Sequence, residues 1–310
     1  MNLSQNIIIS DELLTAINEK KPIVALETHG LAHGLPYPQN EELAKKMVDK
    51  IIQEGALPAF IAMIKGQIRV GLNKEELHLL TTHSADVLKA NRQDLTPFIL
   101  QGNSAGLTVS AGIFIANHCG IRIFSTGGIG GVHYGAEKTF DISNDIYEIA
   151  NNPITVVCGG PKIILDLDKT MEMMETCGIT VCGFQTESLP VFLSRESHLK
   201  VNYEIKNIQD AAKLIHIHQQ LNCKSGLIIT NPIPQEYSIP YEQANHELQK
   251  ALKKAKEQGI SGKDVTIYLL REMNQSMTND VTQSLEQLIL NNSNLSAKIA
   301  VSLSQLEAQE

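Results

Sequence analysis

The sequence predicts an α/β fold of three layers, α/β/α, with a largely parallel, mixed central sheet and a helical C-terminal part. Short apolar runs bounded by Gly, Pro and other turn formers alternate with segments of helical spacing, which is typical of a layered, parallel sheet. After Pro240 nearly every segment has helical spacing. Neither a low-complexity linker nor an internal repeat divides the sequence, so we expect residues 1–310 to form a single domain.

In the first half of the chain, apolar runs predict strands and amphipathic spacing predicts helices. The dipeptide Lys65-Gly66 between two apolar runs predicts a hairpin turn. Strands are expected over 23–26, 59–64, 68–70 and 121–125, and helices over 41–54, 75–80 and 107–118, the last of these buried.

The second half follows the same alternation before it becomes helical. The segment Gly-Ile-Ser-Gly at 259–262 interrupts the helical tail, and Ser261 is a candidate cap for the helix that follows. Right-handed crossovers would place helices on both faces of the sheet. Strands are expected over 154–158, 179–183 and 226–230, and helices over 163–176, 210–222, 241–258, 265–274 and 281–309.

Composition limits the partners and the compartment. The net charge of −8 argues against non-specific binding to a nucleic acid polymer, which depends on basic surfaces. No apolar run has the length of a membrane span, and the N-terminus lacks the features of a signal peptide. The 5 cysteines are an odd set without a CxxC pair, which is typical of free thiols in a reducing compartment. We therefore expect a cytoplasmic protein that binds neither a membrane nor a nucleic acid polymer.

The segment Thr155-Val156-Val157-Cys158-Gly159-Gly160-Pro161-Lys162 reads as a buried strand followed by a turn and a lysine. Lys162 then lies at the carboxyl edge of the sheet, where open α/β folds place their ligands. A lysine that is partly desolvated there can attack a sugar carbonyl carbon as a free amine. The alternative is an ordinary surface lysine in the first turn of a helix.

Glu27 ends the strand at 23–26 and precedes a segment rich in Gly and Pro. A carboxyl group there can act as a general acid or base if burial raises its pKa, or it can simply cap nearby backbone amides. His29 and His33 have the spacing of zinc ligands on a helix. The intervening glycine and Pro36 disfavour a helix, so the sequence does not support a zinc site there.

Two further segments combine glycines, hydroxyls and carboxylates. The glycine-rich segment 124–133 is a candidate phosphate-binding loop, or a tight turn that needs positive φ angles. In the segment 139–145, Asp141 and Asp145 could hold a divalent ion through oxygen ligands, whereas Asp141 or Ser143 could instead cap a helix.

A basic segment precedes these, Lys89-Ala90-Asn91-Arg92-Gln93-Asp94. Lys89 or Arg92 could neutralise a phosphate, although such residues are more often solvated loop charges.

Together these segments resemble the pseudouridine-5′-phosphate glycosidase family, also called the indigoidine synthase A-like family. The resemblance covers almost the whole chain, in the expected order. The residues that carry it are ALETHGLAHGLPYPQN (25–40), FSTGGIGGVHYGAEKTFDIS (124–143), VVCGGPKIILD (156–166), SRES (194–197), NPIP (231–234) and GISGKDVT (259–266).

The resemblance implies a lyase or glycosidase of the pseudouridylate synthase type, in the carbon–oxygen lyase class, that serves nucleoside metabolism. Such an enzyme reversibly cleaves the C–C glycosidic bond of the small molecule pseudouridine 5′-phosphate to give uracil and ribose 5-phosphate. Carbon is a poor leaving group, so the family opens the ribose ring and forms a lysine imine, a Schiff base, at C1′ as an electron sink. The resemblance also implies Mn²⁺ as cofactor and a homotrimer.

By the same resemblance, Lys162 matches the nucleophile, Glu27 the proton donor and Asp141 the Mn²⁺ ligand. The positions that match substrate-binding residues of the family are Lys89, Val109, Thr126, Gly127, His133, Ser143, Asn144 and Asp145.

Several positions depart from the family pattern. His29 follows Glu27-Thr28 where the family usually reads LEST, Asn91 stands in a segment that usually reads KVSRRD, and Tyr134 replaces a common arginine. These changes leave open a related C-glycoside lyase or synthase for a different ribose-phosphate conjugate, or a non-catalytic member of the fold. A class I aldolase also uses an imine-forming lysine, but it would need eight βα units, which the sequence does not show.

Overall fold

The computed structural model describes residues 5–82, 86–260 and 281–309, and between the last two ranges it describes Val265, Tyr268, Leu269, Glu272 and Met273. Half of the residues in the helix expected over 265–274 lie outside the described residues, and its candidate cap Ser261 also lies outside them.

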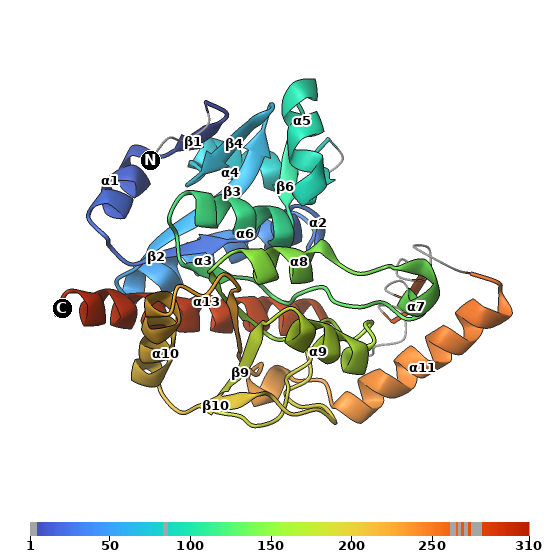
Figure 1. Cartoon of the computed structure of the whole chain (residues 1–310). Coiled ribbons are helices and arrows are strands. Elements are labelled where there is room, and N and C mark those ends of the chain that lie inside the picture. Colours follow the sequence, from blue (N-terminus) through green and yellow to red (C-terminus); the bar gives the residue numbers. More distant parts are fainter. Residues whose placement is uncertain are drawn as a thin grey trace.

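A mixed, mostly parallel sheet forms the centre of the molecule (Figure 1), as predicted. Its strands run in the order β1-β4-β3-β2-β7-β8-β11-β9-β10, and β6, beside β3, carries β5. β3 is antiparallel to both β4 and β6, and the other pairings are parallel. The strands are β1 (Ile7–Ile9), β2 (Ile23–Leu26), β3 (Leu57–Ile64), β4 (Gln67–Val70), β5 (Leu88–Ala90), β6 (Ala105–Leu107), β7 (Ile123–Ser125), β8 (Thr155–Cys158), β9 (Thr180–Phe184), β10 (Tyr203–Ile205) and β11 (Leu227–Thr230).

The helices cover this sheet and extend beyond it. They are α1 (Asp11–Asn18), α2 (His29–His33), α3 (Gln39–Gln53), α4 (Lys74–Thr82), α5 (Leu95–Gln101), α6 (Val109–His118), α7 (Ala136–Thr139), α8 (Asn144–Asn151), α9 (Leu167–Thr176), α10 (Ile208–Gln220), α11 (Tyr241–Glu257) and α13 (Val281–Glu307). Among the residues that the structure describes, no helix combines the length and the apolar character of a membrane span.

Strand side chains alternate between the two faces, which produces three layers. Ala25, Phe124 and Val156 belong to a core shared with α6, α8 and α9. Val24 and Val157 belong to a second core shared with α3, α10 and α13. Figure 1 shows α13 crossing the middle of the molecule, while α11 projects from the body. The predicted three-layer arrangement is therefore confirmed.

Two predicted helices begin later than the spacing suggested. Leu107 ends β6, because Thr108 keeps an extended backbone (φ −71, ψ 173) and α6 begins at Val109. The helix expected from Ile163 begins at Leu167, where the Asp166 side chain accepts a hydrogen bond from the Lys169 amide at 3.2 Å. Lys162 therefore lies in a connecting loop and not in a first helical turn.

The expectation of no helix at His29 and His33 was wrong. Residues His29–His33 form the short helix α2, and the Ala32 amide donates to Thr28 O at 3.0 Å. Leu31 and Ala32 are buried there, so tertiary packing outweighs the weak helix propensity of the intervening glycine.

Candidate active site

The site lies at the carboxyl ends of three adjacent parallel strands, β2, β7 and β8. Glu27 follows β2, Thr126 follows β7, and Lys162 follows β8 after the turn Gly159-Gly160-Pro161. Because parallel strands end at one edge of the sheet, residues far apart in the sequence meet there.

Glu27 is held in a defined environment by its neighbours. The Thr126 hydroxyl donates a hydrogen bond to Glu27 Oε2, and the Glu27 amide donates to Ser125 O at 3.4 Å. Burial raises the pKa of the Glu27 carboxyl above its usual value, and the positive charge of Lys162 opposes this rise. A carboxyl group that retains its proton more readily is suited to act as an acid beside a lysine.

The Lys162 loop pairs with the glycine-rich loop that follows β7. The Gly159 amide donates to Gly127 O at 2.9 Å, and the Ile129 amide donates to Gly160 O at 3.1 Å. The Lys162 amide in turn donates to Ile129 O at 3.1 Å. The parallel pairing of β7 with β8 thus continues into both loops and fixes the backbone at Lys162.

The glycines of the 126–131 loop are needed because neighbouring atoms pack closely against them, and not because of unusual backbone angles. Positive φ angles occur at neither Gly128 nor Gly130. A Cβ at Gly128 would lie 2.6 Å from the Phe192 ring, and one at Gly130 would lie 2.3 Å from Ser143 Oγ. Of the two alternatives for this segment, a phosphate-binding loop or a tight turn with positive φ angles, these glycines do not form the tight turn.

Several backbone amides of this loop already donate hydrogen bonds within the protein. The amides of Thr126, Ile129 and His133 donate to backbone carbonyls, and those of Gly130 and Val132 donate to side chains. A substrate phosphate would therefore depend on the remaining amides, including that of Gly127, and on side chains at the rim.

Asp145 and its neighbours organise the loop from the opposite side. Asp145 Oδ1 accepts from the Ser110 amide at 2.9 Å, and Oδ2 accepts from the Gly130 amide at 2.8 Å. Ser143 caps α8 by accepting from the Asp145 amide at 3.2 Å, and the Asn144 side chain bonds to Gln93. The Asp145 carboxylate thus ties the start of α6 to the glycine-rich loop.

Asp141 and His133 lie together at the rim of the site. His133 Nδ1 is 3.1 Å from Asp141 O and 3.6 Å from Asp141 Oδ1. Within the described part of the chain, no three His, Cys, Asp or Glu side chains are grouped as metal ligands. Asp141 could contribute one carboxylate to an ion whose shell is completed by water and substrate oxygens, as Mn²⁺ and Mg²⁺ accept.

Lys89 and Val109 approach from the β5–β6 side of the sheet. Lys89 is an exposed residue of β5, and its positive charge acts to lower the pKa of both Glu27 and His29. Val109 is buried at the start of α6. The Arg92 guanidinium group lies 3.6 Å over the Phe114 ring, and its Nε is 3.7 Å from Oε1 of buried Glu148.

Lys162 also borders an apolar cavity of about 160 Å³. Val191, Phe192, Leu193 and Ile239 contribute to its lining. The lysine therefore has apolar side chains on one side of it.

Sequence reasoning missed supporting residues that act through long-range contacts. The Thr28 hydroxyl donates to Ile61 O at 2.6 Å and accepts from the Leu107 amide at 3.0 Å. The Asn292 side chain, buried on α13, donates to Thr126 O at 2.9 Å. A polar residue on the apolar face of a long helix is the sequence signal that could have identified Asn292.

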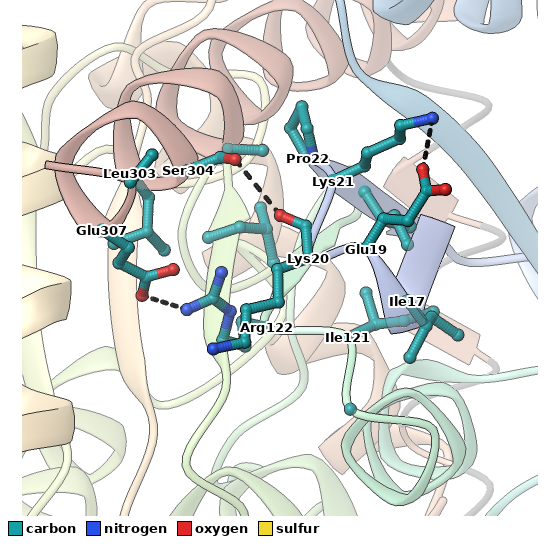
Figure 2. Close-up of a pocket in the computed structure, with 15 residues that line it drawn as sticks. Ile17, Glu19, Lys20, Lys21, Pro22, Ile121, Arg122, Leu303, Ser304 and Glu307 are labelled. Atoms are coloured by element: carbon teal, nitrogen blue, oxygen red, sulfur yellow. Dashed lines mark hydrogen bonds and ion pairs between the residues drawn. The ribbon is translucent and has the colours of Figure 1, made fainter. Parts of the chain in front are cut away.

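A larger cavity of about 620 Å³ lies away from this site, at the start of β2 and β7 (Figure 2). Four of its five charged side chains form two pairs: Lys21 with Glu19 at 2.6 Å, and Arg122 with Glu307. Since neither Glu27 nor Lys162 lines it, this cavity is separate from the proposed chemistry.

Comparisons with known sequences cover nearly the whole chain. The profile of the family described as indigoidine synthase A like protein matches residues 12–302. A pseudouridine-5′-phosphate glycosidase of Caldanaerobacter subterraneus subsp. tengcongensis is 44% identical over 298 residues, which are 96% of this chain and 97% of the relative. A pseudouridine-5′-phosphate glycosidase of Escherichia coli is 41% identical over 292 residues, 94% of each chain.

Solved structures show the same fold. The prealnumycin C-glycosynthase AlnA, solved in complex with ribulose 5-phosphate, matches with a TM-score of 0.93 at 29% identity, over 99% of this chain and 100% of that one. An indigoidine synthase A-like protein from Thermotoga maritima matches with a TM-score of 0.86 at 31% identity, over 98% of this chain and 99% of that one.

Proposed function

The chain belongs to the indigoidine synthase A-like family, and we propose that it acts as a pseudouridine-5′-phosphate glycosidase through an imine on Lys162. The observation that supports the proposal is the position of a lysine and a desolvated carboxyl group at one edge of the sheet, after β8 and β2. The pKa of Glu27 is raised by burial although the charge of Lys162 acts on it. Cleavage of a C–C glycosidic bond needs both a nitrogen nucleophile and a proton donor for the departing carbon.

In the cleavage direction, the Lys162 nitrogen bonds to C1′ as the C1′–O4′ bond breaks and O4′ takes up a proton. The nitrogen lone pair then forms the C=N bond while the C1′–C5 bond to uracil breaks and its electron pair leaves with C5. In this step the nitrogen donates electrons, so the imine forms as the bond breaks and is not the electron sink expected from the resemblance. Glu27 supplies the proton that C5 accepts, and the Thr126 hydroxyl orients the Glu27 carboxyl group. Water adds to the imine, and ribose 5-phosphate and the free lysine are released. The same steps in reverse join the two products.

A related C-glycoside reaction is the second candidate. AlnA is named a C-glycosynthase and its structure holds ribulose 5-phosphate. The changed residue His29 beside Glu27 favours a different base or sugar phosphate in the same chemistry. An aldolase barrel does not fit, because the sheet is open, with β1 and β10 at the two ends of its strand order.

The remaining expectations belong to this proposal. Asp141 would hold Mn²⁺ together with water and a substrate phosphate oxygen, and the ion would neutralise charge on that phosphate; equilibrium dialysis against MnCl₂ measures its binding. A homotrimer would cover exposed apolar side chains such as Phe140, 83% exposed beside Asp141, and light scattering measures its mass. The free cysteines are compatible with the cytoplasm, which fractionation of cells would test.

Borohydride trapping tests the imine directly. Wild-type protein incubated with ribose 5-phosphate and borohydride should gain one pentose-phosphate adduct by intact mass, because reduction makes the C=N bond permanent. Lys162→Ala should gain none, and Lys213→Ala, which removes an exposed lysine of α10, should label like the wild type. Equal labelling of Lys162→Ala, or no labelling of the wild type, would remove Lys162 as nucleophile.

A further inference from the structure

A tight turn at residues 191–194 lies against the loop that carries Lys162. The amides of Val191 and Ser194 each donate to the carbonyl oxygen of the other at 2.9 Å, so Phe192 is the first of two central residues in this turn. The Phe192 amide donates to Gly159 O at 2.7 Å. The turn is therefore bound through its backbone to the loop of the proposed nucleophile.

The Phe192 ring packs against the other loop of the site, which follows β7. A Cβ at Gly128 would lie 2.6 Å from the ring carbon Cδ2, and a Cβ at Gly127 would lie 3.6 Å from Cε2. Because Gly128 has no side chain, the ring can lie directly on the backbone two residues after Thr126. Phe192 thus joins the two loops, one through its amide and the other through its ring.

The backbone of Phe192 is strained. Its φ angle is +53°, in the left-handed region that residues with a large side chain rarely adopt. When the first central residue of a two-residue turn has a positive φ angle, that residue is usually glycine. Glycine would relieve the strain here but would supply no ring. Strained residues cluster at functional sites, so the strain points to a role for the ring.

The ring also borders the space beside the nucleophile. Phe192 and Lys162 both line the apolar cavity of about 160 Å³. A nucleophile attacks efficiently only when it is held in place, and a misplacement of about 1 Å can slow a reaction by about 100-fold. A side chain that touches both loops and forms a wall beside the lysine is well placed to fix that position.

Resting on the proposed function, we propose that Phe192 is a positioning residue for Lys162. Its ring holds the two loops at the separation at which the Lys162 nitrogen attacks C1′. The chemistry stays with Lys162 and Glu27, because a phenyl ring neither donates nor accepts a proton. Loss of the ring should therefore slow imine formation more than it weakens the binding of the sugar phosphate, which depends on several groups.

The test measures how fast the imine forms. The protein is mixed with ribose 5-phosphate at several concentrations, timed samples are quenched with borohydride, and the adduct is quantified by intact mass. Phe192→Gly should lower the maximal rate by about 10- to 100-fold and change the half-saturating concentration by less than about threefold. The control Asn222→Gly relieves a φ angle of +53° at an exposed residue after α10 and should change neither constant.

Phe192→Ala separates the role of the ring from the stability of the fold. Both variants lack the ring, but alanine keeps the backbone strain that glycine relieves. The melting temperature of Phe192→Gly should therefore be the higher of the two, while their maximal rates should agree within about threefold. Rates that instead follow the melting temperatures would show a purely structural residue and would overturn the inference.

Gly128→Ala tests the same contact from the other loop. Its new methyl group would press against the Phe192 ring, so this change alone should also slow imine formation. Once Phe192→Gly has removed the ring, the methyl group should matter less, and the double variant should lose less than the product of the two single losses. Losses that simply multiply would show that the ring and the loop act separately, which contradicts the proposal.

Two further results would overturn the inference while the proposed function stands. These are an unchanged maximal rate in Phe192→Gly, and a change confined to the half-saturating concentration of ribose 5-phosphate. A wild type that forms no adduct at all would instead overturn the proposed function, and the inference with it.

Discussion

At the scale of single residues, the protonation of Glu27 depends on opposing effects. Burial favours the neutral acid, whereas the Lys162 charge and the Thr126 hydrogen bond favour the carboxylate. The acid form is the one that donates a proton to the departing base. Activity in the cleavage direction should therefore be present below the raised pKa of Glu27 and decline as the pH rises through it.

Thr126→Val tests this balance, since it replaces the hydroxyl by a methyl group of similar size. Loss of the hydrogen bond removes a stabilising contact from the carboxylate, so the pKa of Glu27 should rise further. The alkaline limb of kcat/KM for pseudouridine 5′-phosphate should then shift to higher pH. Measured pH profiles of the wild type and Thr126→Val give the shift.

Two companion variants define what the shift means. Glu27→Gln should lower kcat by about 10²- to 10⁴-fold and abolish that limb, because no proton is available. Thr15→Val, which changes an exposed threonine of α1, should leave the profile unchanged. A shift of the limb to lower pH in Thr126→Val would contradict the assignment of Glu27 as the acid.

The sequence could place Glu27 and Lys162 because each follows a strand whose end is marked by turn formers. It could not predict that Thr126 bonds to Glu27, since the two residues are 99 positions apart and meet only in the assembled sheet. Nor could it predict the ring environment of His29, because local propensity argued against α2. The roles of Asp141 and of the phosphate-binding positions stay predictions.

At the scale of elements, α13 secures the end of β7 from below the sheet. Buried Asn292 donates to Thr126 O at 2.9 Å and accepts from Asn231 Nδ2 at 3.1 Å. The C-terminal helix therefore fixes the residue that orients Glu27, although it contributes no predicted catalytic group.

Asn292→Ala should lower the free energy of unfolding by about 2–4 kcal/mol, because two buried polar groups lose their partner. Urea denaturation followed by circular dichroism measures the change. Asn294→Ala is the matched control on the same helix. Among the described residues its side chain bonds only to Glu54, at 2.9 Å and at the partly buried surface, and its loss should cost about 0.5 kcal/mol or less. Equal losses in the two variants would show that the Thr126 contact has no special weight.

Helices and strands were predicted correctly where an apolar run or a helical spacing was clear. They were missed where a short segment depends on contacts with neighbouring elements. The strands at the centre of the sheet are apolar runs, and they were identified within a few residues. The edge strands β1 and β10 have only 3 residues each, too few for a periodic signal. The late start of α9 depends on the Asp166 cap and on the pairing of the Lys162 loop with Ile129, which spacing cannot show.

At the scale of the whole molecule, the sheet and one helical layer approach each other closely at Gly112. Gly112 of α6 lies against the fully buried ring of Phe124 on β7, and a Cβ at Gly112 would lie 2.6 Å from a ring carbon. Since β7 carries Thr126 at its end, any separation of α6 from the sheet would also disturb the site.

Gly112→Ala should therefore lower the free energy of unfolding by about 1–3 kcal/mol, although alanine is the better helix former. Gly30→Ala on α2 is the control, because nothing lies within 4 Å of its Cβ and stability should rise by up to about 1 kcal/mol. Adding Phe124→Leu to Gly112→Ala makes room for the new methyl group, so the pair should be more stable than the sum of the two single changes. Urea denaturation of the wild type, Gly112→Ala, Phe124→Leu and the double variant completes the cycle. Strict additivity of their free energies of unfolding would show that this contact does not hold the layers apart.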